Sequence, residues 1–424
     1  MKKKNFFFMM IFLVFIIIEP VSYLAFKYRY NWPVIENYKA RLESVENYSF
    51  NEKLEVIMPI TGTTIVHATP EFVDRFKIND YKGLGIFDDG VDNDKELYAL
   101  LIGDSFTRGI GSKDNLLYGW VEIVERKIKK LDLLNLGYSG SGQIQQINFY
   151  NKIKKHFKHQ IVLMNFTLGS DFRDNVEKYF DSNDYFARLP DSIDKNKFIR
   201  NVQYASNYRT SFHFLAFSPV RLYSVWSILA IYEKLISKHP PFSNIDKDLQ
   251  QYSKVASMFN EKEIPASVKS LRRKKTVTQE SPDGKFVYSF DPRLYQTSMG
   301  QIAERIAKHS AGIINAFFEH LRREKKHFIL ILHPSREQIY LNNFSKDTYN
   351  FDYARDKLKN YLNKNISLFD LTVPMRNAAK ETNNPLYYRI DGHYTQEGYK
   401  IAANLICEFL LNDDFIKERI VVNN

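Results

Sequence analysis

Five short, continuous apolar runs recur along the chain, and segments with helical periodicity separate them. The runs cover residues 98–102, 131–136, 161–168, 327–332 and 366–371. Apolar runs of this length without polar alternation are typical of strands buried on both faces. Strands that alternate with helices favour a parallel sheet with crossover helices. The pattern therefore predicts an α/β fold built around a five-stranded parallel sheet.

The segments between these runs place apolar residues at helical spacing. They cover residues 120–130, 143–155, 302–321 and 354–362, and a last helix follows Thr395. Thr395 is a suitable N-cap, and Glu397 in the first turn complements the helix dipole. Several of the strands end in glycine and small polar residues, as at Gly103-Asp104-Ser105. In open α/β sheets this carboxyl edge is where ligands bind, so we look for the site there.

The N-terminus has the pattern of a targeting segment. Lys2–Lys4 precede an apolar run from Phe6 to Ile18, and a mostly apolar stretch from Val21 to Phe26 follows Glu19-Pro20. The shorter run is typical of a signal peptide, whereas the longer stretch is sufficient to cross a bilayer. We expect an uncleaved signal anchor over residues 1–26, with a cleaved signal peptide as the alternative. Both place the remainder outside the cytoplasm, on the periplasmic or outer face of the cell membrane.

The remaining chain divides by composition and periodicity. Residues 27–95 are expected to form a linker followed by a lead-in of short strands. Residues 96–175 and 296–424 carry the α/β pattern described above. Residues 176–295 interrupt that pattern with a long, basic and aromatic stretch. We expect this stretch to be a helical insertion that packs on the core or lies on the membrane surface.

Charge and composition limit the partners that we expect. The chain has 60 Lys and Arg residues against 49 Asp and Glu residues, a formal net charge of +11. No nucleic-acid-binding module is visible, and scattered lysines fit solvated faces, so nucleic acid is not an expected partner. Cys407, the single cysteine, lies in an apolar helical pattern and is expected to be a buried thiol. The histidines lack metal-ligand spacing, so neither a metal nor a cofactor is expected.

The ends of the predicted strands supply the groups that acyl transfer requires. These are a hydroxyl nucleophile, a base, an acid that orients the base, and donors for an oxyanion. Ser105 is the candidate nucleophile, His393 the candidate base and Asp391 its orienting acid. The candidate oxyanion donors are the backbone N–H groups of Ser105 and Gly140 and a polar side chain within Gly169-Ser170-Asp171. Because parallel strands end at one edge of a sheet, we expect these distant residues to converge.

Four short blocks resemble the SGNH (GDSL-type) hydrolase family. They are Gly103-Asp104-Ser105, Gly140 within residues 135–142, Gly169-Ser170-Asp171 and Asp391-Gly392-His393. The resemblance covers about residues 97–175 and 300–411. It implies a flavodoxin-like three-layer α/β/α sandwich with a five-stranded parallel sheet. It also implies that the blocks carry the nucleophile, the oxyanion donors and the acid–base pair.

Two departures from the family pattern bear on activity. The third block has Ser170 where the family has an asparagine that donates to the oxyanion. The loss of one such donor costs about 10²–10³ in rate, and Asn165 or a water molecule is the alternative donor. The acid–base block is D-x-H rather than D-x-x-H, as in relatives that resemble polysaccharide O-acetyltransferases.

Other polar residues near the strand ends have their own interpretations. His333 follows the fourth apolar run and is the main rival base, although a core or rim position is the expected one. Asp104 is expected to stabilise the turn, and Asp171 to tie loops together beneath the site. Arg108 is expected in a surface ion pair, or facing an anionic substrate. Cys407 is not expected to be a nucleophile, because its helix face is apolar.

The sequence therefore predicts a membrane-anchored, extracytoplasmic serine esterase with an acyl-enzyme mechanism. The expected substrate is an ester, with the O-acetyl groups of a cell-envelope polysaccharide preferred. The first alternative is a polysaccharide O-acetyltransferase, which shares the chemistry up to the acyl-enzyme. The second is a non-catalytic envelope scaffold with an SGNH fold, which Ser170 and the large insertion favour and the intact Ser, His and Asp oppose.

Overall fold

The computed structural model contains two compact units, which are described separately. It describes residues 17–18, 20–22, 48–51, 56–59, 61–81, 84–86, 94–177, 276–281, 284–341 and 348–421. The first unit comprises Met1–Asn47, Ile65–Val73 and Asp194–Tyr252, and the second comprises Tyr48–Thr64, Asp74–Ile193 and Ser253–Asn424. Within the first unit the Thr69 hydroxyl accepts the backbone N–H groups of Glu71 at 3.2 Å and Phe72 at 3.1 Å, which turns the chain there.

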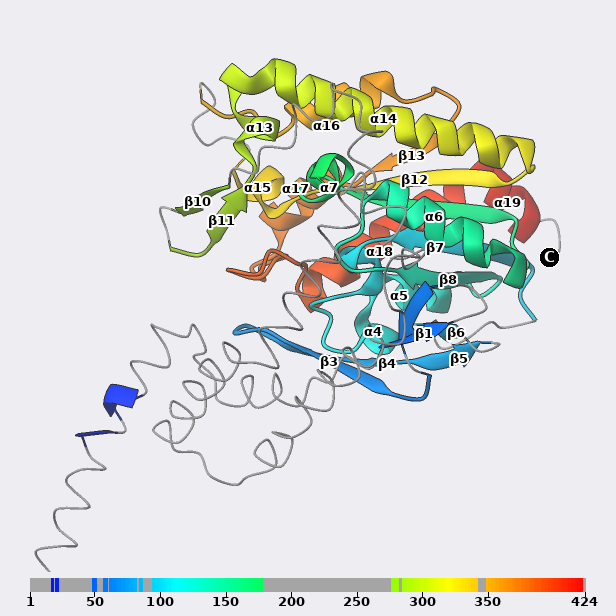
Figure 1. The fold of residues 1–424 in the computed structure, drawn as a ribbon, viewed down its shortest axis with the longest axis horizontal. Helices are drawn as coiled ribbons and strands as arrows, with labels where there is room; N and C mark the ends of the chain where they lie inside the picture. The colour runs from blue at the N-terminus through cyan, green and yellow to red at the C-terminus, as the bar shows by residue number, and fades with distance from the viewer. Residues whose placement is uncertain are drawn as a thin grey trace, which may run out of the picture. The chain divides into compact units, whose positions relative to one another are not determined.

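The second unit is built on a five-stranded sheet in which every strand pair is parallel (Figure 1). Its strands are β7 (Leu97–Gly103), β8 (Leu131–Gly137), β9 (Ile161–Thr167), β12 (His327–His333) and β13 (Ser367–Asp370). The strand order is β13-β12-β9-β7-β8, which is the 2-1-3-4-5 order of flavodoxin-like doubly wound sheets. All residues of β7, β8 and β9 are buried. The prediction of an α/β fold with a five-stranded parallel sheet is confirmed.

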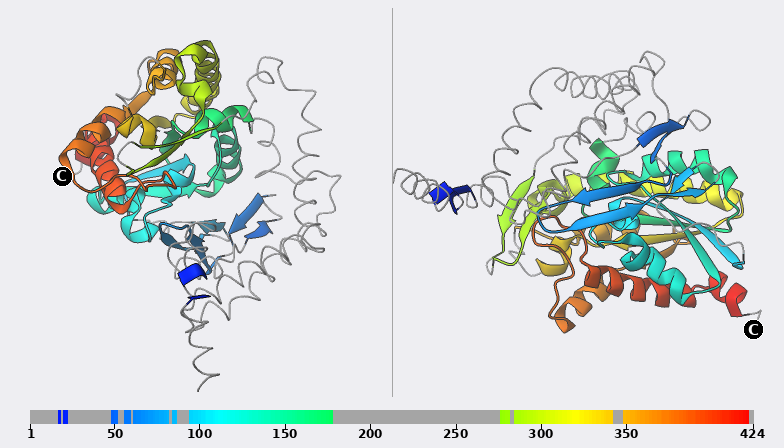
Figure 2. Two further views of the ribbon diagram at one scale, coloured as in Figure 1. Left: turned by 90° about the vertical axis from the view of Figure 1, so that its left-hand side faces the viewer. Right: turned by 90° about the horizontal axis from the view of Figure 1, so that it is seen from below.

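Helices cover both faces of this sheet, so the second unit has three layers (Figures 1 and 2). Neighbouring residues of β7 alternate between two cores: Leu100 and Ile102 face one, and Ala99 and Leu101 face the other. One core packs against α6 (Gln143–Ile153), α7 (Asp171–Glu177), α14 (Gly300–Arg323) and α16 (Tyr353–Tyr361). The opposite core packs against α5 (Trp120–Lys127), α17 (Thr372–Glu381), α18 (Gln396–Asn412) and α19 (Asp414–Val421).

Short helical elements link the longer ones in the second unit. They are α3 (Ser105–Arg108), α4 (Asn115–Tyr118), η1 (Lys154–His156), α13 (Pro292–Tyr295), η3 (Thr297–Met299) and α15 (Arg336–Tyr340). The predicted cap of the last long helix is confirmed, because the Thr395 hydroxyl accepts the Gly398 N–H at 3.2 Å at the start of α18. A capped start of this kind fixes where the chain leaves the preceding loop, which is the loop that carries His393.

The predicted lead-in contains short strands, as expected. They are β1 (Tyr48–Asn51), β2 (Val56–Pro59), β3 (Thr64–Ala68), β4 (Val73–Lys77), β5 (Asn79–Tyr81) and β6 (Leu84–Ile86). Strand β1 pairs antiparallel with β2, and β5 pairs antiparallel with β6. On β4 the side chains of Asp74 and Phe76 are fully buried, whereas Arg75 and Lys77 are exposed. This strand therefore directs an acidic side chain inward.

The helical insertion predicted over residues 176–295 needs a correction at its end. Residues 178–275 lie outside the described residues. The described end forms an antiparallel hairpin of β10 (Val277–Glu280) and β11 (Val287–Phe290). Tyr288 and Phe290 are buried and alternate with Ser289, which is the period-two pattern of a strand. The helical prediction is wrong for these residues. It was based on the overall composition of a long stretch, in which this short alternation of buried and exposed side chains does not stand out.

The predicted membrane anchor over residues 1–26 falls almost entirely outside the described residues, which include only 17–18 and 20–22 of it. Across the part of the chain that the structure describes, we find no helix with the length and apolar character needed to cross a membrane.

Candidate active site

The candidate nucleophile lies in a tight turn at the carboxyl end of the central strand β7. The strand ends at Gly103, and α3 begins at Ser105. Asp104 is the N-cap of α3, because its carboxylate accepts the Phe106 N–H at 3.0 Å. Gly109, with φ 89°, ends this single helical turn. The turn leaves the Ser105 side chain half-buried at the edge of the sheet.

The candidate acid and base share a loop that is closed by its own backbone. The Thr395 N–H donates to the Leu386 carbonyl at 3.0 Å, and the Tyr388 N–H donates to the His393 carbonyl at 3.0 Å. Asp391 and His393 lie near the tip of this loop, and each side chain is 20% exposed. The acid–base pair is therefore held by a defined backbone and still has access to solvent.

The structure brings the three predicted catalytic side chains together. The Ser105 Oγ and the His393 Nε2 are 2.8 Å apart, although 288 positions separate these residues in the sequence. The His393 Nδ1 is hydrogen-bonded to Asp391 Oδ1. The two segments are tied at a second point, where the Tyr388 hydroxyl donates to the Gly111 carbonyl at 2.8 Å. The hydroxyl, imidazole and carboxylate thus form a continuous hydrogen-bonded chain.

Three carboxylates act on the pKa of His393. Burial by itself lowers the pKa of this imidazole, but the hydrogen bond and charge of Asp391 and the charges of Asp104 and Asp74 raise it above its usual 6.5. An opposite charge nearby favours the protonated imidazole, which is the form that His393 takes on accepting a proton from Ser105. The electrostatics of the site therefore stabilise the imidazolium.

A buried polar network lies beneath the nucleophile turn. The Asp104 carboxylate also accepts the hydroxyls of Thr167 at 3.0 Å and Ser170 at 3.1 Å. Burial raises the pKa of Asp104 despite these hydrogen bonds. Asp171 accepts the Gln143 amide at 2.7 Å and the Thr167 N–H at 2.8 Å, and burial together with the Asp104 charge raises its pKa. Asp104 and Asp171 thus stabilise the turn and the loops, as predicted.

The candidate oxyanion residues have different surroundings. Gly140 is exposed, with φ 73°, in a loop that the Tyr138 N–H attaches to the Gly103 carbonyl at 2.8 Å. The Ser170 hydroxyl donates to Asp104, and its N–H donates to the Thr167 carbonyl at 3.1 Å. Both donor groups of Ser170 are thus directed at protein acceptors, and its role at an oxyanion stays a prediction. 

The alternative donor Asn165 lies in the core. Its side-chain amide donates to the Thr107 hydroxyl at 2.7 Å, and the residue is fully buried on β9. Asn165 therefore links the sheet to the turn that carries Ser105. The side-chain amide of Asn165 thus donates a hydrogen bond within the protein interior.

The rival residues occupy the interior. His333 is fully buried against the rings of Phe106 and Trp120, and burial lowers its pKa to about 3. Neither of its ring nitrogens has a hydrogen-bond partner among the residues that the structure describes. It is a core residue. Cys407 is a buried thiol on α18, as expected. The expectation of a surface position for Arg108 is wrong, because its guanidinium is buried 4.6 Å from the centre of the Phe76 ring.

Sequence reasoning missed Asp74, a buried acid close enough to act on His393. Its carboxylate accepts the N–H groups of Gly111 and Lys113, each at 2.7 Å. Burial raises the pKa of Asp74 to about 6, although these two hydrogen bonds lower it. The loop that follows α3 is therefore held by an acid from β4. The sequence signal that could have found Asp74 is an acidic residue at an inward-facing position of a strand with alternating buried and exposed side chains.

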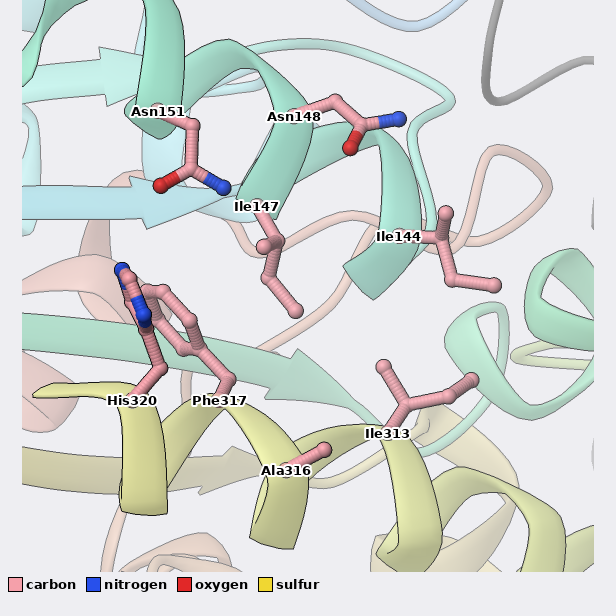
Figure 3. Close-up of a pocket in the computed structure, with 8 residues that line it drawn as sticks. All are labelled: Ile144, Ile147, Asn148, Asn151, Ile313, Ala316, Phe317 and His320. Atoms are coloured by element: carbon pink, nitrogen blue, oxygen red, sulfur yellow. The ribbon is translucent and has the colours of Figure 1, made fainter.

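A separate groove of about 270 Å³ lies between α6 and α14 (Figure 3). It is lined by Ile144, Ile147, Asn148, Asn151, Ile313, Ala316, Phe317 and His320, none of which is a predicted site residue. For metals, the described ranges between 17 and 421 contain no group of three or more His, Cys, Asp or Glu side chains that could hold an ion.

The fold and the site together define a doubly wound α/β protein with a Ser–His–Asp arrangement at the carboxyl edge of its sheet. No protein-family model matches the chain, and no curated protein matches it. Among solved structures, LAE5, an alpha/beta hydrolase enzyme from the metagenome of Lake Arreo, Spain, matches with a TM-score of 0.34 and 12% identity. The match covers 74% of this chain and 95% of that protein.

Proposed function

We propose that this protein is a serine ester hydrolase of the SGNH (GDSL-type) class. The observation that carries the proposal is the 2.8 Å contact between Ser105 Oγ and His393 Nε2, with Asp391 bonded to the opposite ring nitrogen. Acyl transfer to a serine requires these three groups in this order. The carboxyl edge of a 2-1-3-4-5 sheet is also where doubly wound folds bind their ligands.

The proposed reaction proceeds through an acyl-enzyme. Ser105 Oγ attacks the ester carbonyl carbon while its proton passes to His393 Nε2. Asp391 stabilises the resulting imidazolium, and the electrons of the carbonyl move onto its oxygen. Collapse of this intermediate breaks the bond to the alcohol, which leaves with the proton from Nε2. Water then attacks the acyl-enzyme by the same sequence, which releases the acid and restores Ser105.

The oxyanion of this reaction needs at least one donor from the surrounding backbone. The proposed donors are the N–H groups of Ser105, the first residue of α3, and of Gly140. The first N–H groups of a helix have no partner within the helix. Ser170 joins them if its hydroxyl turns from Asp104, 3.1 Å away, toward the substrate.

Acyl transfer to a sugar is the second candidate function. Its support is the D-x-H spacing of Asp391 and His393, which resembles that of polysaccharide O-acetyltransferases. In that case a sugar hydroxyl replaces water as the second nucleophile.

We further propose O-acetyl groups of a cell-envelope polysaccharide as substrate, and an extracytoplasmic position behind an N-terminal membrane anchor. The position rests on Lys2–Lys4 and the apolar run that follows, and the substrate rests on that position together with the D-x-H spacing.

The test is covalent labelling of the full chain with a fluorophosphonate, followed by mapping of the modified residue. An esterase or acyltransferase reacts at Ser105, and the matched Ser105→Ala variant does not. If Ser105 stays unmodified in a folded wild-type protein, the esterase proposal fails and a non-catalytic scaffold remains. Acetate release from an O-acetylated glycan, measured with and without an acceptor sugar, then separates the two reactions. Transfer is refuted if all the acetate appears in solution with acceptor present.

A further inference from the structure

A buried arginine at the start of α15 contacts the loop that carries Asp391 and His393. Arg336 comes shortly after β12 ends, and its side chain is 3% exposed. Ser335 caps α15: its hydroxyl accepts the Gln338 N–H at 3.3 Å, and its own N–H donates to the Gln338 amide oxygen at 2.9 Å. This capping box holds the backbone of Arg336 in place.

The guanidinium of Arg336 donates mainly to backbone carbonyls. Nη1 donates to the carbonyls of Tyr388 at 2.8 Å and Arg389 at 2.6 Å. Nη2 donates to the carbonyl of Val287. The Glu337 carboxylate lies farther from Nη2, at 3.5 Å. A planar guanidinium presents several donors in fixed directions, which suits carbonyls that converge from two segments, whereas an ammonium group is a compact point charge.

Val287 brings the hairpin β10–β11 into the same contact. Its N–H donates to the Arg389 carbonyl at 2.8 Å, so hairpin and loop are also joined directly. The Ser289 N–H donates to the Glu337 carboxylate at 3.2 Å, and the Arg389 side chain donates to the Gly284 carbonyl at 3.0 Å. The end of the insertion is thus attached both to the acid–base loop and to α15, the helix that carries Arg336.

The two loop carbonyls lie close to the acid–base pair. Tyr388 and Arg389 precede Asp391, and the Tyr388 N–H closes the loop onto the His393 carbonyl. A Cβ added to Gly392, which has φ 90°, would lie 4.0 Å from the Arg336 guanidinium carbon. We propose that Arg336 is a positioning residue, which holds the Asp391–His393 loop on hairpin β10–β11 so that His393 Nε2 reaches Ser105 Oγ.

This inference rests on the proposed function, because it assigns Arg336 to the alignment of the proposed triad. Without the guanidinium, the carbonyls of residues 287, 388 and 389 lose their shared donor. The loop can then shift relative to α3, which belongs to a different segment. A displacement of about 1 Å at reacting groups costs about 10²-fold in rate.

The experiment compares Arg336→Lys and Arg336→Met in the full chain by two measurements. The first is the second-order rate constant for fluorophosphonate labelling of Ser105. The second is the NMR titration of His393, whose signal is identified by its loss in His393→Gln. We expect labelling to fall about 10²-fold in Arg336→Met and less in Arg336→Lys. We also expect the pKa of His393 to fall toward its usual value, because a shifted loop carries the imidazole away from the Asp104 and Asp74 charges that raise this pKa.

Arg355 offers a matched control. It is also buried, at 9% exposure, and its guanidinium pairs with Asp352, Asp356 and Asp370 around α16 and β13. Arg355→Met should lower the melting temperature and leave both measurements unchanged. The proposal is overturned if Arg336→Met is labelled at the wild-type rate and its His393 titration is unchanged. If the wild type itself is not labelled, the proposed function fails, and the His393 titration alone still decides whether Arg336 positions the loop.

Discussion

The close approach of β8 to the nucleophile turn gives the sharpest prediction. Gly137 ends β8, and a Cβ added there would lie 2.4 Å from the Arg108 backbone nitrogen and 2.9 Å from the Thr107 carbonyl carbon. Asn135 ties the same two segments together, because its amide donates to the Thr107 carbonyl at 2.9 Å and its oxygen accepts the Gly137 N–H at 3.0 Å. Gly137→Ala therefore forces β8 and α3 apart.

The size of the effect follows from these distances. Ordinary contacts of a Cβ begin at 3.4 Å, so the segments must separate by about 1 Å, and a backbone nitrogen cannot rotate away. Overpacking of this kind costs about 1–3 kcal/mol of the unfolding free energy. Since α3 carries Ser105, we also expect labelling by a fluorophosphonate to slow by about 10²-fold.

The assay pairs urea unfolding with the labelling rate. Gly312→Ala is the matched control, because Gly312 is exposed within α14 and a Cβ there meets nothing within 4 Å. That variant should gain about 0.5–1 kcal/mol, since alanine is the better helix former, and it should label at the wild-type rate. The reasoning is refuted if Gly137→Ala matches the wild type in both measurements.

Three further predictions concern pH. Labelling requires neutral His393, so the wild-type rate should fall with decreasing pH through a midpoint above 6.5; in Asp391→Asn the midpoint should move down and the plateau should drop. Because burial lowers the pKa of His333 to about 3, the stability that this neutral imidazole contributes is present above pH 6.5 and is lost as pH falls, by about 5 kcal/mol in total. His333→Leu should remove this loss from the unfolding free energy measured in urea. An identical dependence of that free energy on pH in both proteins would contradict the prediction. Because burial raises the pKa of Asp74 to about 6, the stability that its protonated carboxyl contributes is present below pH 3.8, and about 3 kcal/mol is lost as pH rises through 6. Asp74→Asn should make the unfolding free energy nearly independent of pH between pH 4 and 7. The same decrease in the variant as in the wild type would argue against a raised pKa of Asp74.

The sequence alone determined the five-stranded α/β core of the second unit. Its apolar runs are continuous because those strands are buried on both faces, so each strand could be recognised without knowing its neighbours. The cap at Thr395 and the N-cap role of Asp104 are likewise local, since each depends on backbone N–H groups two or three residues away. The rule that parallel strands end at one edge then placed Ser105 and His393 together, and their side-chain atoms are 2.8 Å apart.

Only the tertiary structure decided which polar residues support that contact. Asp74 and Arg336 belong to no motif, and their partners are backbone groups of segments far away in the chain. Arg108 was expected at the surface and His333 was the rival base, yet both pack against aromatic rings in the interior. Burial and hydrogen bonding of such groups depend on what packs around them, and this is set by the whole fold rather than by the local pattern of residues.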